Sequence, residues 1–187
     1  MGQIHNSYIL CESDTGLILI DQHAAHERVL YEQLKRRLKG LAGAAQKLLV
    51  PETMELGYRE AGIVEKLIED FYQLGLEVEP FGGNTFVVKS VPALLSGRET
   101  APLIIEIVEK LAAVGFSRGL GESLDACLQI MACHGAIRAN QALSGKQIRG
   151  LLNQMDQCDN PSHCAHGRPT WIHWTLRSLE KSFHRVL

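Results

Sequence analysis

The sequence predicts an α+β fold, and two features of the chain lead to this prediction. Near the N-terminus, two short apolar runs flank Asp14-Thr15-Gly16, an arrangement typical of a β-hairpin. Further along, several segments with helical periodicity surround a second pair of strand-like runs. The chain has 187 residues, 45% of them hydrophobic, which suffices for one core or two small ones.

The predicted hairpin strands are residues 7–11 and 16–20. The second strand is apolar at every position from Leu17 to Ile20, so both of its faces need cover. A helix can cover one face and a second subunit the other. A helix follows from Ala24 to about Lys39, and Gly40 and Gly43 are expected to end it.

The middle of the chain predicts a compact α+β unit. An extended run from Gln46 is expected to stop at Pro51. Beyond it we predict a helix over 59–74, strands over 76–81 and 85–91 joined by the turn Gly82-Gly83-Asn84, and helices over 102–114 and 123–137.

The C-terminal part predicts a helix over 144–155, with Ser144 as its N-cap. An irregular polar loop over 156–169 comes next. A short strand over 170–174 and a helix over 176–184 complete the chain.

The charge balance restricts the classes of function. Charged residues make up 21% of the chain and the formal net charge is -2, whereas proteins that grip DNA unaided carry a basic excess that neutralises phosphates. No run approaches the roughly 20 apolar residues of a membrane span, and the first residues do not resemble a signal peptide. Five cysteines without a pairing pattern favour a reducing cytoplasm.

The first candidate site joins Asp21, His23 and Glu27, where a predicted strand runs into a helix. Side chains two apart on a strand and four apart on a helix can lean the same way. Two carboxylates and an imidazole suit a borderline divalent metal. The alternative is that Asp21 only caps the helix, while Glu27 and Arg28 lie on a solvated face.

The second candidate site is the segment with Cys158, His163, Cys164 and His166. These four residues could form a closed zinc knuckle. Alternatively, Cys164 and His166 complete the ligand set begun by His23 and Glu27, or no metal binds, because Cys-x-His spacing alone is a weak signal.

The remaining cysteines lie in apolar patterns. Cys133 and His134 are adjacent on a predicted helix, where such a pair more often packs in a core than binds a metal. Cys11 and Cys127 are expected to pack as small apolar residues.

Three motifs together resemble one family, the MutL-type DNA mismatch-repair proteins. The segment from Asp21 to Glu32 matches the endonuclease signature DQHA-x2-E-x4-E, and the segment 132–138 is similar to the family's ACHxAIR motif. The segment 164–169 resembles CPHGRP, with Ala165 in place of proline, which should loosen the loop slightly. The resemblance covers nearly the whole chain.

The resemblance implies an outer dimerisation subdomain made from both chain ends, residues 1–54 and 141–187, which carries the metal site. A smaller regulatory subdomain, residues 55–140, is inserted between them. It also implies a homodimer in the bacterial cytoplasm, associated with the nucleoid during repair.

The segment Gln46-Lys47-Leu48-Leu49-Val50-Pro51 resembles the family's Q-x-x-[LI]-x-P segment, which docks on the replicative sliding clamp. Gln46 would hydrogen-bond, Leu49 would fill an apolar pocket, and Pro51 would lower the ordering cost of the extended peptide. The alternative is an ordinary edge strand.

The resemblance further implies a metal-dependent endonuclease that nicks duplex DNA with weak sequence preference. The expected ligands are Asp21, His23, Glu27, Cys164 and His166, with Cys133 as a further candidate. The thiolate favours Zn²⁺ in one position, and the carboxylates tolerate Mn²⁺. Arg168 is expected to contact a backbone phosphate.

Gln22 and Glu32 are expected to support the ligands without binding metal. DNA, the clamp and other mismatch-repair proteins are the implied partners. The alternative function is a non-catalytic dimerisation scaffold with a structural zinc site.

Overall fold

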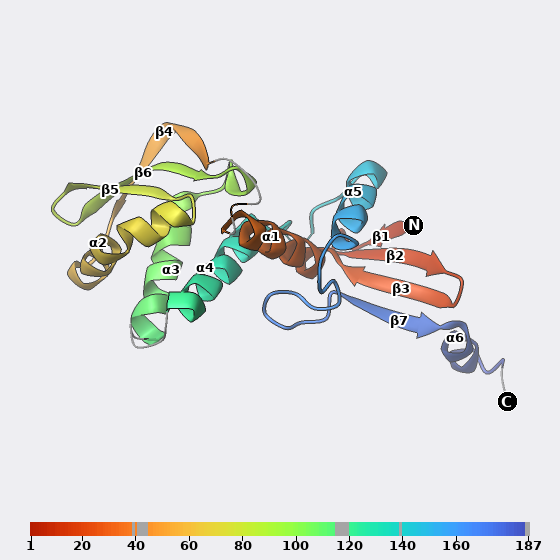
Figure 1. Ribbon diagram of the computed structural model, residues 1–187. Helices are drawn as coiled ribbons and strands as arrows, with labels where there is room; N and C mark the ends of the chain where they lie inside the picture. Colours follow the sequence, from red (N-terminus) through yellow and green to blue (C-terminus); the bar gives the residue numbers. More distant parts are fainter. Residues whose placement is uncertain (39, 41–44, 115–119, 139, 186–187) are drawn as a thin grey trace. The chain divides into compact units, whose positions relative to one another are not determined.

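The computed structural model describes residues 1–38, 40, 45–114, 120–138 and 140–185 (Figure 1). The chain forms two compact units. The first contains residues 1–32 and 136–187, and the second contains residues 33–135. Both units contain helices and strands, so the predicted α+β class is confirmed.

The first unit is built on a four-stranded antiparallel sheet with strand order β1-β2-β3-β7. Its strands are β1 (Gly2–Ile4), β2 (Tyr8–Ser13), β3 (Gly16–Asp21) and β7 (Trp171–Thr175). The hairpin β2–β3 was predicted, whereas β1 was not. Because β7 pairs with β3, the two ends of the chain share one sheet (Figure 1).

One face of this sheet carries the core of the first unit. Ile9 and Ile20 lie opposite each other on β2 and β3 and are buried. Helix α1 (Gln22–Leu38) packs on them with Ala25 and Val29. Helix α5 (Gly145–Met155) adds Ile148, Leu151 and Met155.

The predicted cap of α5 is confirmed. The Ser144 side chain accepts a hydrogen bond from the backbone N–H of Gln147, and the Gln147 side chain accepts one from the backbone N–H of Ser144. This reciprocal capping box satisfies two backbone donors that a helix start leaves unpaired.

The opposite face of the same sheet is apolar and half-exposed. Residues directly opposite each other in a ladder share a face, so the register places seven apolar side chains there. We call them the outer sheet face: Ile4, Tyr8, Leu10, Leu17, Leu19, Ile172 and Trp174. Of the two faces of β3 that were expected to need cover, the described residues of this chain therefore bury only one. Helix α6 (Leu176–Ser182) follows β7.

The second unit has a three-stranded antiparallel sheet with order β4-β6-β5. Its elements are β4 (Ala45–Glu55), α2 (Tyr58–Gln73), β5 (Glu77–Gly82), β6 (Thr85–Pro92), the 3-10 helix η1 (Ala93–Leu95), α3 (Thr100–Val114) and α4 (Leu120–Gly135). Its core contains buried side chains from both helices and strands, among them Phe71 on α2, Phe86 on β6 and Ile104 on α3. Gly82 and Gly83 have positive φ in the predicted turn between β5 and β6.

One expectation about this region was wrong. Strand β4 does not stop at Pro51 but continues to Glu55, because residues 52–55 pair with β6. The compact units divide the chain at other residues than the predicted subdomains: residues 33–54 lie in the second unit, and residues 136–140 lie in the first. Gly40 adopts a left-handed φ of 73° after α1 as expected of a helix stop, and Gly43 lies outside the described residues.

Within the described part, no helix is both long and apolar enough to cross a membrane.

Candidate metal centre

Three of the predicted ligands meet in the first unit. One ligand atom each from Glu27, Cys164 and His166 lies within 4.8 Å of the others. Glu27 comes from α1, and the other two come from the loop between α5 and β7. A carboxylate, a thiol and an imidazole therefore converge from segments far apart in the sequence, while His23 is not part of this group.

Glu27 is the clearest sign that these residues suit a cation. Its side chain is fully buried. Its Oε2 accepts a hydrogen bond from Arg168 Nη2 at 3.2 Å. Its Oε1 lies against His166 Nδ1 without hydrogen-bond geometry, so this buried oxygen has no hydrogen-bond donor among the described residues. A buried carboxylate oxygen without a donor is costly, and a bound cation would satisfy it.

The loop that carries the other two ligands is a tight turn. The backbone N–H of Cys164 donates to the Arg168 carbonyl at 2.8 Å, and that of Gly167 donates to the Cys164 carbonyl at 3.0 Å. Gly167 has a φ of 81°, a left-handed conformation that favours glycine. This turn places Cys164, His166 and Arg168 beside Glu27, with Ala165 in the position of the missing proline.

Arg168 contacts the cluster through Glu27 in this structure. Its hydrogen bond with Cys164 is the main cause that raises the pKa of the Arg168 guanidinium, and the charge of Glu27 adds to it. The expected phosphate contact of Arg168 stays a prediction, because the structure shows its guanidinium engaged with two of the expected metal ligands.

Asp21 caps the helix. Its Oδ1 accepts hydrogen bonds from the backbone N–H groups of His23 at 2.9 Å and Ala24 at 3.0 Å. The capping interpretation is thus correct for this oxygen. The further interpretation, that Glu27 lies on a solvated face, was wrong.

His23 is oriented in a way that suits a ligand. Its Nδ1 lies 2.9 Å from the carbonyl oxygen of Ile137. Because a carbonyl only accepts, Nδ1 carries the proton, and in a neutral ring Nε2 keeps its lone pair for a metal. His23 and Asp21 as ligands remain predictions.

Gln22 does not stand behind the ligands as expected. Its buried amide accepts from Gln3 Nε2 at 2.6 Å and donates to the carbonyl oxygens of Asn6 and Gln141. Gln22 therefore ties the start of α1 to the first strand and to the segment before α5.

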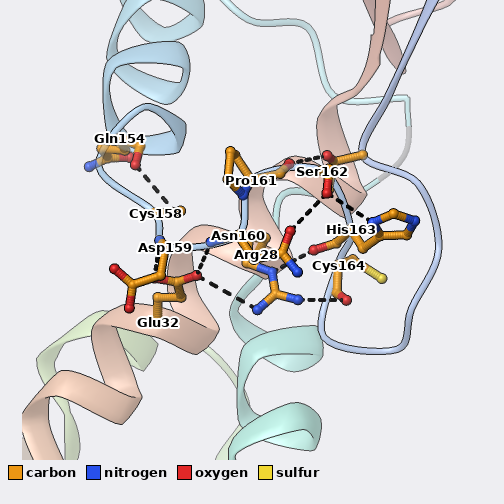
Figure 2. Close-up of polar contacts among 11 residues, drawn as sticks. Arg28, Glu32, Gln154, Cys158, Asp159, Asn160, Pro161, Ser162, His163 and Cys164 are labelled. Carbon is orange, nitrogen blue, oxygen red and sulfur yellow. Dashed lines mark hydrogen bonds and ion pairs between the residues drawn. The ribbon is translucent and has the colours of Figure 1, made fainter.

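Glu32 and Arg28 hold the segment that leads to Cys164 (Figure 2). The Glu32 carboxylate accepts from the backbone of Asp159 and Asn160, and Arg28 donates to the carbonyl oxygens of His163 and Cys164. Sequence reasoning missed Arg28. Its i,i+4 spacing to Glu32 was the available signal.

The four-residue zinc knuckle is not formed among the described residues. Cys158 Sγ donates to the Gln154 carbonyl at 3.5 Å, and Cys158 packs against the apolar core (Figure 2). His163 Nδ1 is 2.9 Å from Ser162 Oγ. Neither belongs to the cluster around Glu27.

The other cysteines agree in part with their expected packing roles. Cys127 is buried, and burial raises the pKa of its thiol to about 12 with a further contribution from Asp70. Burial also raises the pKa of Cys11, which packs against the core of the first unit. Cys133 lies on α4 in the second unit, and its role as a ligand stays a prediction.

The Gln46–Pro51 segment lies on β4, at the edge of the second sheet. The pairing with β6 shifts register between Lys47 and Glu52, so residues 48–51 leave the ladder. Leu49 and Val50 are exposed there, although both are large and apolar. The segment is thus part of an edge strand whose bulge adds an exposed apolar tip that an ordinary edge strand lacks, and clamp docking stays a prediction.

Comparison with known proteins shows to which family the chain belongs. The model of the MutL C terminal dimerisation domain matches residues 1–143. The chain belongs to this family. Among curated proteins, it is 42% identical over 186 residues to the DNA mismatch repair protein MutL of Citrifermentans bemidjiense, covering 100% of this chain and 29% of that protein.

Two further relatives carry the same name. The protein from Geobacter sp. is 43% identical over 186 residues, with 100% of this chain and 29% of the relative covered. The protein from Xylella fastidiosa is 41% identical over 185 residues, with 99% and 30% covered. The chain thus spans less than a third of the length of these relatives. The family match also supports the predicted homodimer.

Proposed function

We propose that this chain is the metal-dependent endonuclease region of a mismatch-repair protein, and that it nicks one strand of duplex DNA. The observation that carries the proposal is the buried Glu27 Oε1, which faces His166 and Cys164 and has no hydrogen-bond donor in the described part of the chain. The family match and the relatives' name support the repair context.

The chain's own residues have distinct tasks at this site. Glu27 Oε1, Cys164 Sγ and His166 Nδ1 would hold the metal, and His23 Nε2 and Asp21 Oδ2 are the further donors we assign to it. Arg168 holds Glu27 Oε2 and so directs Oε1 toward the cluster. A bound divalent cation supplies a water of lowered pKa and neutralises phosphate charge. The thiolate favours Zn²⁺, and the carboxylates accept Mn²⁺.

We also assign the dimer contact to the outer sheet face. It is continuous across four strands, and four of its seven side chains are large, apolar and exposed: Ile4, Tyr8, Ile172 and Trp174. Monomeric proteins rarely leave such a patch uncovered. A second copy of the chain is its proposed partner, because the matched family is a dimerisation domain.

Docking on the sliding clamp belongs to the same proposal. The bulge between Lys47 and Glu52 takes Leu49 and Val50 out of the sheet, so an apolar side chain and unpaired backbone groups are available together. This is what a groove needs to bind an extended peptide. Clamp docking would also bring DNA to a chain whose net charge is -2.

The test is nicking of closed-circular DNA with Mn²⁺ and a loaded clamp, comparing the parent with Asp21→Asn. Asparagine caps helices as well as aspartate does, so this variant removes a charge while keeping the cap of α1. Nicking by the parent and none by a folded, dimeric variant is the expected result. If the full-length protein also fails to nick, the endonuclease proposal is refuted.

The alternative is a dimerisation scaffold with a structural zinc site. The engagement of Asp21 Oδ1 as a helix cap favours it, since that oxygen already has two partners. Zinc bound with high affinity, combined with no metal-dependent nicking by the full-length protein, would decide for the scaffold.

A further inference from the structure

We propose that Arg28 and Glu32 form a strut that fixes the segment 158–164 to α1 and thereby sets the position of Cys164. The proposal rests on the proposed function only in taking Cys164 as a metal ligand. Arg28 and Glu32 would be positioning residues, because they act on the ligand loop through its backbone.

The Glu32 end of the strut binds the start of the loop. Its Oε2 accepts from the backbone N–H of Asp159 at 2.8 Å, and its Oε1 accepts from that of Asn160 at 3.2 Å (Figure 2). The Glu32 side chain is buried, and hydrogen bonds to a buried carboxylate are stronger than those between neutral groups. Glu32 therefore holds the backbone of Asp159 and Asn160, shortly after the end of α5, against α1.

The Arg28 end binds the loop at the ligand itself. Arg28 Nη2 donates to the Cys164 carbonyl at 3.0 Å, and Nε donates to the His163 carbonyl at 2.5 Å. Nη1 lies 3.7 Å from Glu32 Oε1, and the guanidinium stands over the Tyr31 ring at 5.2 Å. The planar fork of arginine makes these contacts simultaneously, which a lysine cannot reproduce.

The strut matters because of where Arg28 lies in the sequence. It follows Glu27 directly, so one helix supplies the carboxylate ligand and also anchors the residue that supplies the thiol. The two candidate ligands, Glu27 and Cys164, are 137 positions apart in the sequence. With the strut in place, the loop needs little ordering when a metal binds, and such preorganisation raises affinity.

The experiment uses the 187-residue protein as the parent, the variants Arg28→Lys and Glu32→Gln, and Arg149→Met as a control on the exposed side of α5. Hydrogen exchange of the Asp159 and Asn160 amides is measured on metal-free protein. Zinc affinity is measured by competition with a chromophoric chelator. Circular dichroism and sedimentation confirm that each variant is folded and has the parent's oligomeric state.

We expect faster exchange at both amides and a zinc affinity lowered by about 10–100-fold in each strut variant, with the control equal to the parent. Exchange that matches the parent in both strut variants would overturn the proposal, as would parental zinc affinity despite faster exchange. If the parent itself does not bind zinc, the metal centre fails, and the exchange data alone then decide whether the strut positions the loop.

Discussion

Glu27→Gln should abolish most of the stabilisation that zinc gives to the chain while changing the metal-free protein little. The substitution keeps the size of a fully buried side chain and keeps one oxygen for Arg168. It removes the negative charge of the carboxylate whose Oε1 has no hydrogen-bond donor among the residues that the structure describes. Since Arg168 is largely exposed, its lost ion pair contributes little. We expect the metal-free free energy of unfolding to change by less than about 1 kcal/mol.

The size of the zinc-dependent gain in the free energy of unfolding follows from thermodynamic linkage. At free zinc 100-fold above its dissociation constant, binding adds about 2.7 kcal/mol to the stability of the parent. A variant that binds zinc about 100-fold more weakly, because it has lost one of the proposed ligands, would gain only about 0.4 kcal/mol at the same zinc concentration. The expected difference is therefore about 2.3 kcal/mol.

The assay is urea unfolding at one fixed protein concentration, with buffered zinc and with chelator, for the parent, Glu27→Gln and a control Glu180→Gln on α6. The protein concentration must be constant because dimer stability depends on it. An equal zinc-dependent gain in the parent and Glu27→Gln would refute the reasoning. A large loss of stability in metal-free Glu27→Gln would also refute it, because Glu27 would then be a structural residue.

The other predictions concern the dimer, the clamp and the first unit. Trp174→Asp places a charge on the outer sheet face and should weaken the dimer at least 100-fold, or about 2.7 kcal/mol; a dimer unchanged in sedimentation would assign the contact elsewhere. Leu49→Ala should weaken clamp binding about 10-fold without altering the urea transition, because Leu49 is fully exposed; equal affinities in a binding titration would argue against docking. Ser144→Ala removes the capping box of α5 and should lower the free energy of unfolding by about 1 kcal/mol; an unchanged urea midpoint would contradict this.

Elements that depend on neighbouring residues could be predicted from the sequence. The hairpin β2–β3, the turn at Gly82-Gly83-Asn84 and the cap at Ser144 all follow from local spacing and local hydrogen bonds. The three-motif resemblance likewise indicated the family, which the comparison confirmed. It also brought Glu27, Cys164 and His166 together as candidates before any geometry was known.

Features that depend on distant partners could not be predicted in this way. Strand β4 continues past Pro51 because β6, more than thirty residues later, offers a ladder for residues 52–55. Gln22 has the pattern of a residue beside a metal site, yet Gln3 and Gln141 use its amide.

Arg28 shows the difference most clearly. The sequence places Arg28 beside Glu27 on a helix, where an arginine is normally solvated. An i,i+4 ion pair with Glu32 would stabilise such a helix by only about 0.2–0.5 kcal/mol. The contact of Arg28 with the Cys164 carbonyl joins residues 136 positions apart. Periodicity and spacing indicate local backbone geometry. A contact between Arg28 and Cys164 depends instead on long-range pairing, because β7 follows the Cys164 loop and pairs with β3, which precedes α1. The motifs therefore identified the candidate ligands, and contacts between distant segments decide which side chains surround them.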